Sequence, residues 1–489
     1  MGAGTTGTAK ATRKWQKPAG VGKNMVARRA IRTDRTEILC QLRAGGVCVR
    51  VQVYGTRIQT SGIGKGGKRF VKNEETAQDR VILHSDFNCF YASAETVLHP
   101  EYRGQPIAVC GSTAERHGIV LAKSEPAKRA GVKTGMTNAE AMSLCPGLLI
   151  VPPHFEVYSK FSRMARKIYA RYTDLIEPFG MDECWLDVSG STRLFGSGEE
   201  IAENIRRTIR EELGLTVSVG VSFNKVFAKL ASDLKKPDAV CVVSRENFKE
   251  MLYPLPVSAL LYVGRATLGR LSAWGIRTIG DLAATDPALL RDLLGVNGLS
   301  LWNAANGLDS SPVAHMDDRT PAKSLSHGVT CSADLTDADA VRHVILELSQ
   351  SLTGRLRDEK MSALGVELYV KNSDLGGERF STRLPEPTQS PSVITRAADE
   401  IFRKNYRWRK NVRAVTVALS PLCPEDQPFQ PDLFRDEAAI AKRDKMDGTV
   451  DVIRRKFGSR SILPAELLRP SPVPEDNDRE TVLPGGGHR

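Results

Sequence analysis

The sequence predicts an α/β fold for its central part, followed by a helical region and a C-terminal α+β region. Between residues 80 and 250, short apolar runs bounded by turn residues alternate with segments of helical spacing, a pattern typical of helices packed on one sheet. Beyond residue 250, helical segments punctuated by glycines come first, and strands and helices then return. With 489 residues, the chain is long enough for about three or more domains of ~100–200 residues each.

The composition is that of a globular protein. Hydrophobic residues make up 41% of the chain and charged residues 26%, and no run of about 18 apolar residues predicts a membrane span. The nine cysteines are scattered without a Cys-x-x-Cys pair, which favours free thiols over disulfides or a zinc site. The sequence shows no basic segment followed by an apolar stretch, the pattern of a secretion signal, so secretion is not predicted. We therefore expect a cytoplasmic protein without membrane contact.

The first 79 residues carry most of the net charge. They hold 16 Lys and Arg against 5 Asp and Glu, so +11 of the net +12 lies there. Residues 46–60 alternate loosely and predict a strand or hairpin. Residues 62–69 nearly match a phosphate loop, but Arg69 stands where a hydroxyl should bind Mg²⁺, so a flexible basic loop is the better interpretation. We expect residues 1–79 to be a basic, disordered extension, which either adds affinity for nucleic acid or reflects an upstream start codon.

Residues 81–93, Val-Ile-Leu-His-Ser-Asp-Phe-Asn-Cys-Phe-Tyr-Ala-Ser, place a carboxylate close to a buried strand. A short apolar run leads towards Asp86, so the acid is expected at the end of a rigid element. Taken alone, this aspartate is better explained as a helix N-cap.

A second acidic pair lies nearly a hundred residues downstream. Within residues 176–187, Asp182 and Glu183 stand between a turn and another apolar run. Alone, this pair is better explained as a solvated turn. Two acidic strand ends brought together, however, form a site for hard divalent cations, which prefer oxygen ligands. The combination favours Mg²⁺-dependent nucleotidyl transfer.

Strand and helix patterns alternate around these acids. The predicted strands are residues 105–111, 118–122, 148–153, 184–188 and 216–222. The predicted helices are residues 90–98, 126–130, 139–144, 158–172, 201–213 and 224–232.

Three ordered motifs in this region resemble the Y-family of translesion DNA polymerases. They are Ser-Asp-Phe-Asn-Cys-Phe-Tyr-Ala-Ser (85–93), Ile-Glu-Pro-Phe-Gly-Met-Asp-Glu-Cys-Trp-Leu-Asp-Val (176–188) and Gly-Val-Ser-Phe-Asn-Lys-Val-Phe-Ala-Lys-Leu-Ala-Ser-Asp-Leu-Lys-Lys-Pro (220–237). The resemblance covers about residues 80–457 and is nearest to the bacterial members. It implies a right-hand polymerase architecture, with a palm at 80–89 and 154–243, fingers at 90–153, a helix-hairpin-helix thumb at 244–314, a linker at 315–323, a little finger at 324–424 and a tail at 425–489.

The resemblance also implies a role for each matching residue. Asp86 and Asp182 would be the metal ligands for two Mg²⁺ ions, and Glu183 the catalytic acid beside them. Tyr91 would be the steric gate that excludes a 2′-hydroxyl, and Lys236 would reach the triphosphate.

The finger segment departs from the family pattern of Tyr-x-x-Arg. Glu125 and Lys128 stand at the matching positions. A lysine is a point charge that cannot fork onto phosphate as arginine does, although Lys128 remains a triphosphate-binding candidate. A triphosphate would repel Glu125, which is therefore expected to point away or to pair with Lys123.

The C-terminal half offers candidates for holding DNA. Glycine-punctuated helices in residues 255–313 resemble the family's helix-hairpin-helix turns, whose amides bind phosphates without reading sequence. Arg407, Arg409 and Lys410 cluster with Tyr406 and Trp408 beside a predicted strand. Such a run usually marks a solvated face, but aromatic neighbours make it a candidate for phosphate binding.

A short peptide near the C-terminus resembles the motif by which bacterial polymerases dock on the sliding clamp. Gln430 is followed by Leu433 and Phe434 in a proline-rich stretch. An exposed apolar pair fits capture in a hydrophobic groove. The alternative is a hydrophobic contact back onto the little finger.

The sequence thus predicts a monomeric, error-prone translesion DNA polymerase that acts in DNA repair. Its expected partners are primer-template DNA, deoxynucleoside triphosphates, Mg²⁺ and a sliding clamp. A non-catalytic repair scaffold of the same family would be expected to lack the three carboxylates, and a palm-fold nucleotidyl cyclase would have no use for the thumb, the little finger or the clamp peptide.

Overall fold

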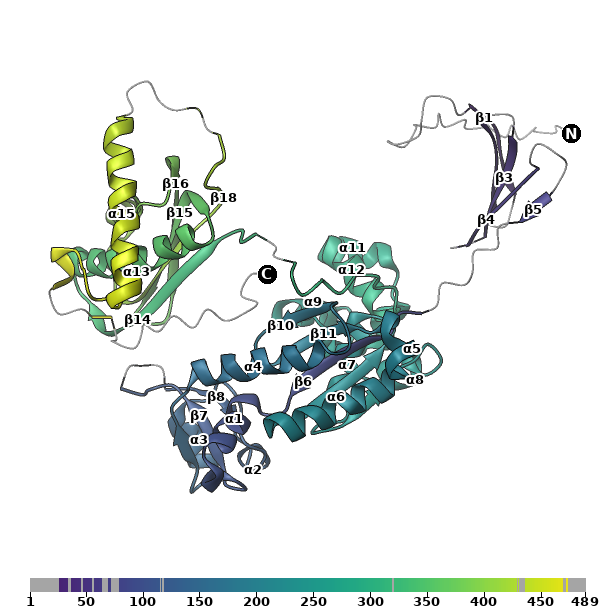
Figure 1. Ribbon diagram of the computed structural model, residues 1–489, viewed down its shortest axis with the longest axis horizontal. Helices are drawn as coiled ribbons and strands as arrows, with labels where there is room; N and C mark the ends of the chain where they lie inside the picture. Colours follow the sequence, from purple (N-terminus) through teal and green to yellow (C-terminus); the bar gives the residue numbers. More distant parts are fainter. Residues whose placement is uncertain are drawn as a thin grey trace, which may run out of the picture. The chain divides into compact units, whose positions relative to one another are not determined.

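The computed structural model covers two compact units, Met1–Asp79 and Arg80–Arg489 (Figure 1). The residues it describes are five strands between residues 26 and 71, and residues 79–468 except 115, 117, 319–320, 429 and 431–435, together with 472–473. Within this described part, no helix is both long and apolar enough to cross a membrane.

The first unit contains an antiparallel sheet in which each strand pairs with the next along the chain. Its strands are β1 (Val26–Thr33), β2 (Glu37–Ala44), β3 (Val47–Tyr54), β4 (Arg57–Ile63) and β5 (Arg69–Val71). The hairpin expected within residues 46–60 is present as β3 and β4. These strands depart from the disordered extension predicted for residues 1–79, because connections of two or three residues between the first four strands let neighbours pair directly. Residues 1–24 lie outside the described part.

The second unit is built around a five-stranded mixed sheet, here called the palm sheet. Its strands, in spatial order, are β10 (Ile176–Phe179), β11 (Glu183–Asp187), β6 (Ile82–Phe87), β12 (Val217–Ser222) and β13 (Val240–Val242). Every residue of the neighbouring strands β6 and β12 is buried. Burial along a whole strand means that both faces of the sheet are covered.

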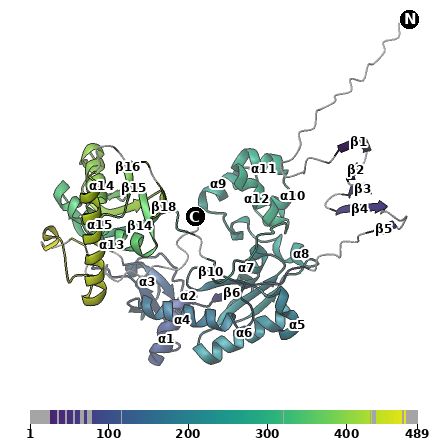
Figure 2. The same cartoon turned by 45° about the horizontal axis from the view of Figure 1, so that its top comes forward.

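Figure 2 shows α4 (Phe155–Tyr169) and α6 (Gly198–Leu213) on one side of β6 and α7 (Lys225–Leu234) on the other. The alternating side chains of β12 explain this, because Val217 and Val219 join the core of α6. Gly220 faces α7 so closely that a Cβ atom there would overlap the backbone of that helix. The short elements η2 (Ser189–Ser191) and α5 (Thr192–Phe195) lead into α6.

Residues 90–153, which were predicted to form the fingers, contain a small sheet of their own. Its strands, in spatial order, are β8 (Val120–Lys123), β7 (Ile107–Cys110) and β9 (Leu149–Val151). The helices here are α1 (Phe90–Leu98), η1 (Pro100–Tyr102), α2 (Glu125–Arg129) and α3 (Asn138–Leu144). Thr137 and Glu140 form a capping box that starts α3.

A helical region follows the palm sheet. It consists of α8 (Phe248–Leu252), η3 (Val257–Ala259), α9 (Arg265–Ala273), α10 (Ile279–Ala284), α11 (Pro287–Leu294) and α12 (Val296–Ala305). Gly295 joins α11 to α12 with a φ of +68°, a conformation that favours glycine. The glycine punctuation of the sequence therefore corresponds to a tight helix–helix turn.

The last large region is an antiparallel sheet covered by helices. Its strands, in spatial order, are β14 (Leu325–Leu335), β17 (Val412–Leu419), β15 (Met361–Asn372) and β16 (Gly377–Thr388), and β18 (Leu422–Pro424) pairs with β15. The helices are α13 (Ala338–Asp358) and α14 (Pro391–Asn405), which pack against each other and against the sheet.

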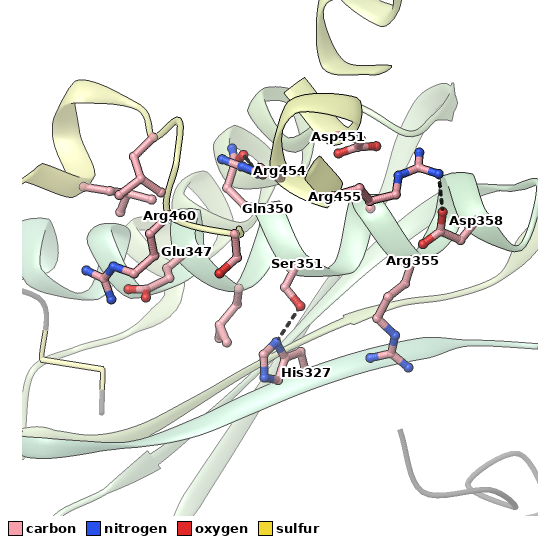
Figure 3. A pocket seen from close by; sticks show the side chains of 15 residues that line it. His327, Glu347, Gln350, Ser351, Arg355, Asp358, Asp451, Arg454, Arg455 and Arg460 are labelled. Atoms are coloured by element: carbon pink, nitrogen blue, oxygen red, sulfur yellow. Dashed lines mark hydrogen bonds and ion pairs between the residues drawn. The ribbon is translucent and has the colours of Figure 1, made fainter. Parts of the chain in front are cut away.

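A further helix, α15 (Glu437–Phe457), is joined to α13 by side-chain hydrogen bonds, and η4 (Ala465–Leu468) follows it. Arg357 on α13 donates to Asp451 on α15, with 2.9 Å between Nη2 and Oδ1. Arg454 Nη1 lies 3.0 Å from Gln350 Oε1. Figure 3 shows the cavity of about 240 Å³ beside this contact. Four arginines and three acidic residues line it, so its charges nearly balance: Arg355, Arg454, Arg455, Arg460, Glu347, Asp358 and Asp451.

Candidate active site

The palm sheet brings the two predicted acidic segments together. In the antiparallel register of β6 and β11, Asp86 is paired directly with Glu183. Asp182 lies in the turn before β11, and its carbonyl oxygen accepts a hydrogen bond of 3.1 Å from Phe87 N. The two acidic segments are nearly a hundred residues apart in the sequence, but adjacent strands bring them together. The three carboxylates therefore lie at one end of the sheet.

Burial dominates the electrostatics of this cluster. It raises the pKa of Asp86 to about 7, against the opposing effect of the Lys236 ammonium and with help from Glu183. The pKa of Asp182 is also raised, first by burial and then by the charge of Glu183. Burial acts on Glu183 in the same direction, but a hydrogen bond from His84 and the charge of Lys229 lower its pKa to about 2.

Two lysines pair with two of the three carboxylates in this structure. Lys236 Nζ lies 2.6 Å from Asp86 Oδ2 and 2.7 Å from Asp233 Oδ1. Lys229 Nζ contacts Glu183 Oε2 and lies 5.2 Å from the ring centroid of Phe179. The acidic cluster thus attracts cationic groups from α7 and from the segment that follows it.

The donor set fits a hard divalent cation. Three carboxylates at one strand end supply the oxygen ligands that Mg²⁺ prefers, and their mutual repulsion favours an added positive charge. Among the residues described, no three His, Cys, Asp or Glu side chains are close enough to enclose a metal ion. Asp86 and Glu183 instead make the lysine contacts given above.

His84 belongs to the same cluster, although its pattern in the sequence predicts no catalytic role. Its ring is fully buried, with Nε2 3.2 Å from Glu183 Oε2 and Nδ1 2.8 Å from Ser232 Oγ. Burial lowers the pKa of His84 to about 4, so the ring is neutral at pH 7. It orients the Glu183 carboxylate. One clue in the sequence pointed to this place: His84 and Asp86 are two residues apart on a strand, so their side chains lie on the same face of the sheet.

A cavity of about 220 Å³ opens beside the carboxylates. Asp182, Lys236 and Lys128 line it together, so it collects one of the three clustered carboxylates and both lysines predicted to bind a triphosphate. The remaining lining residues are Phe87, Asn88, Cys89, Phe90, Leu121, Ala122, Lys123, Glu125 and Thr134. Asp86, Glu183 and Tyr91 are not among the lining residues.

Glu125 lies in the cavity wall and does not point away from it. Its Oε1 atom is 3.3 Å from Lys128 Nζ and also 3.3 Å from Cys89 Sγ. The predicted pairing of Glu125 with Lys123 is wrong, because Lys123 Nζ donates instead to Thr134 Oγ1 at 3.0 Å. Glu125 and Lys128 are three residues apart on α2, so their side chains lie on the same face of the helix and can pair directly.

Tyr91 lies in the first turn of α1, next to the cavity wall formed by Cys89 and Phe90. Its ring stacks on that of Tyr158 with 4.3 Å between centroids and an interplanar angle of 11°. Burial, followed by the charge of Asp182, raises the pKa of Tyr91 to about 12. The tyrosine therefore stays neutral and is supported on one face by protein.

The predicted DNA-contact residues lie between α14 and β17. Arg407, Arg409 and Lys410 are exposed, and Lys410 pairs with Asp374. The aromatic residues of this cluster are not interleaved on the surface. Tyr406 is buried and stacks on Phe402 with 5.1 Å between ring centroids, and Trp408 packs against both rings.

Of the predicted clamp-binding residues, only Gln430 is described, and it is exposed. Leu433 and Phe434 lie outside the described residues.

Comparisons with known proteins agree with this geometry. The model of the impB/mucB/samB family matches residues 85–233, and the model of that family's C-terminal domain matches residues 322–433. The DNA polymerase IV of Acetivibrio thermocellus is 48% identical over 390 residues, which cover 80% of this chain and 98% of that protein. The DNA polymerase IV 1 of Bacillus subtilis is 35% identical over 394 residues, or 80% of this chain and 94% of that protein.

A solved structure of a Y-family DNA polymerase chimera is also similar. It has a TM-score of 0.63 and 26% sequence identity, and the match covers 70% of this chain and 99% of that one. The right-hand polymerase fold predicted from the sequence is confirmed by this match. The chain belongs to the Y-family of DNA polymerases, alongside the bacterial DNA polymerase IV proteins.

Proposed function

We propose that this DNA-directed DNA polymerase adds deoxynucleotides to a primer 3′-hydroxyl by two-metal-ion nucleotidyl transfer, in the error-prone copying of damaged templates during DNA repair. One observation carries the proposal. Asp86, Asp182 and Glu183 meet at one end of the palm sheet, beside a cavity lined by Lys128 and Lys236.

Each residue of the cluster has a distinct task in this proposal. Asp86 and Asp182 hold the metal ions, and Glu183 is the catalytic acid beside them, oriented by His84. Bound Mg²⁺ supplies charge neutralisation and activation of the attacking hydroxyl. Lys236 and Lys128 bind the triphosphate, because ammonium groups at the cavity wall attract its negative charge. Positioning and charge stabilisation then account for most of the rate.

Primer extension with Mg²⁺ tests the assignment. We expect the double variant Asp182→Ala/Glu183→Ala to lose template-dependent synthesis and to keep DNA binding. Asp187→Asn is the matched control, because this acid lies at the other end of β11 and hydrogen-bonds locally to Ser189. Synthesis that survives in the double variant would contradict the site. A wild-type protein that binds DNA without any synthesis would favour the alternative of a non-catalytic repair scaffold.

Tyr91 is the proposed filter for the sugar. Its ring is held beside the cavity by Tyr158, so a ribose 2′-hydroxyl would meet a supported aromatic face. Tyr91→Ala should admit ribonucleotides during primer extension, while an unchanged ratio of deoxyribonucleotide to ribonucleotide use would refute the role.

Two further contacts belong to the proposal. The exposed Arg407, Arg409 and Lys410 bind the phosphates of primer-template DNA. Residues 430–434 dock on a sliding clamp, and their deletion should abolish clamp-stimulated synthesis and leave unstimulated synthesis intact. The protein is proposed to act as a cytoplasmic monomer.

A further inference from the structure

A buried acid on α1 has no place in the proposed mechanism. Glu95 is fully buried, in a helix whose other buried residues are Phe90, Ala92 and Ala94. Its Oε2 atom finds no hydrogen-bond partner among the described residues. A buried polar atom without a partner destabilises the fold, and more so when it is charged. Such a group calls for a specific explanation.

The other carboxylate oxygen of Glu95 joins two groups at the start of α4. Oε1 accepts a short hydrogen bond from the hydroxyl of Tyr158, which is also fully buried. The same atom lies 2.9 Å from Nδ1 of His154, the residue that precedes α4. Glu95 thus ties α1 to α4 through a tyrosine hydroxyl.

That tyrosine is the one that supports Tyr91. The rings of Tyr158 and Tyr91 stack with 4.3 Å between centroids, and Phe155 makes an edge contact with each ring at 5.9 Å. Tyr91 and Glu95 are four residues apart on α1, so they lie on the same face of the helix. Glu95 therefore holds the hydroxyl of Tyr158, while the proposed sugar filter Tyr91 stacks on the face of the same ring.

We propose that Glu95 and Tyr158 are positioning residues that fix the ring of Tyr91 and so set how strictly the site selects deoxyribose over ribose. This inference rests on the proposed role of Tyr91. A filter that works by exclusion must resist displacement by the group it excludes. A single aromatic stack adds little stabilisation beyond the area that it buries. A hydrogen bond that stops the Tyr158 ring from tilting therefore makes the support of Tyr91 more rigid.

The variants separate anchoring from packing. Tyr158→Phe keeps the ring and removes the hydroxyl, and Glu95→Leu removes the acceptor at similar volume. Both should raise kcat/KM for a ribonucleotide about 3- to 10-fold and leave kcat/KM for the matching deoxyribonucleotide within about twofold. Glu95→Gln retains an oxygen that can accept from Tyr158 and should keep most of the wild-type selectivity.

A matched control for Tyr158→Phe is available on α4, the helix that carries Tyr158. Tyr169 is buried on α4, and its hydroxyl donates to Ser85 Oγ at 2.9 Å, in a place where it makes no ring contact with Tyr91. Tyr169→Phe should cost stability comparable to that of Tyr158→Phe in thermal unfolding but should leave sugar selectivity unchanged. Loss of packing alone would lower the use of both nucleotides and would not raise ribonucleotide use.

Single-nucleotide primer extension with Mg²⁺ distinguishes the outcomes. In a Tyr91→Ala background, Tyr158→Phe should have no further effect on selectivity, because coupled residues are non-additive. If Tyr91→Ala does not relax selectivity, the proposed filter itself fails. If Tyr91→Ala relaxes it but Tyr158→Phe and Glu95→Leu do not, the filter stands and the anchor is overturned. Equal relaxation by Tyr169→Phe would also overturn the anchor.

Discussion

At the scale of single residues, the cavity beside the carboxylates contains a charge that opposes its proposed ligand. Glu125 lines the cavity and holds Lys128 at 3.3 Å. A triphosphate must therefore compete with a carboxylate for that ammonium group. The departure from the family pattern at these positions predicts a weaker grip on the nucleotide, not a missing one.

Replacing this acid should tighten nucleotide binding. Glu125→Gln is expected to lower KM for deoxynucleotides about 2- to 5-fold with kcat nearly unchanged, because one partly exposed ion pair contributes about 0.2–1 kcal/mol. Steady-state primer extension measures both constants. Glu156→Gln removes an exposed acid from the start of α4 and is the matched control. An unchanged or higher KM in Glu125→Gln would show that the carboxylate does not oppose the triphosphate.

The raised pKa of Asp86 makes stability depend on pH. Burial raises this pKa to about 7 from an ordinary value of 3.8, so the folded protein binds the proton more tightly than the unfolded chain does. The stabilisation by the protonated form is complete below about pH 4 and is lost as the pH rises through about 7. Above pH 7, ionised Asp86 therefore destabilises the metal-free fold.

A neutral isostere should remove that penalty. Without Mg²⁺, Asp86→Asn is expected to have a higher melting temperature than the wild type at pH 8, by about 2–4 °C for each kcal/mol gained. The difference should shrink as the pH falls from 7 to 4. Added Mg²⁺ should stabilise the wild type more than the variant, because only the wild type keeps the proposed ligand. A difference that stays constant from pH 4 to pH 8 would contradict the assigned pKa.

At the scale of elements, α7 matters because it carries two members of the site. Lys229 contacts Glu183, and Ser232 holds the ring of His84. The helix α7 can pack close to the palm sheet because β12 has a glycine, Gly220, where the two elements touch. A Cβ atom at Gly220 would overlap Ala228 O and Ser232 N, which are backbone atoms of α7.

Adding one methyl group at this contact should therefore disturb both stability and catalysis. Gly220→Ala is expected to cost about 2–3 kcal/mol, the upper range for overpacking, because no side-chain rotation relieves a clash with backbone. It should also lower kcat by displacing Lys229. Gly190→Ala is the control, since a Cβ atom there would meet nothing within 4 Å. Thermal unfolding and primer extension measure the two effects, and equal behaviour of both variants would contradict the packing argument.

The same elements show which features a sequence can predict. Asp86, Asp182 and Glu183 were predictable because strand ends and turns leave local patterns in the sequence. The order of the three motifs, which resembles that of a known family, indicated that these acids belong to one site. The role of His84 was not, since it depends on Ser232 and Glu183, which other elements bring to the ring. The partner of Glu125 was predicted wrongly for a related reason. Side-chain pairing depends on which neighbour the folded backbone brings within reach.

The aromatic residues between α14 and β17 illustrate the same limit. Tyr406 and Trp408 alternate with cations in the sequence, a pattern that predicts a mixed surface. In the fold, both rings turn inward onto Phe402, because α14 ends at Asn405 and the chain bends there to enter β17. Only the cations remain exposed, so any contact with DNA at this place depends on charge and not on stacking.

At the scale of the whole molecule, the charge and the chemistry lie in different units. The proposed active-site residues all belong to the unit Arg80–Arg489, whereas residues 1–79 carry +11 of the net charge of +12. Positive charge attracts the DNA backbone whatever its sequence. The first unit is therefore expected to add affinity for DNA without adding catalysis.

Removing residues 1–79 should separate the two properties. The remaining chain is expected to keep its kcat on saturating primer-template DNA. Its association constant K for DNA should be lower than that of the full-length protein at low salt. The slope of log K against log salt concentration should become shallower by about 0.9 for each phosphate that the shortened protein no longer neutralises. Fluorescence anisotropy across a salt series measures the slope. A full-length variant with Gln at Lys10, Arg13, Lys14, Lys17 and Lys23 is the control for length, and it should flatten the slope by a smaller amount. If truncation leaves the slope unchanged, the basic charge does not contact DNA, and the cations of the second unit carry all of the binding.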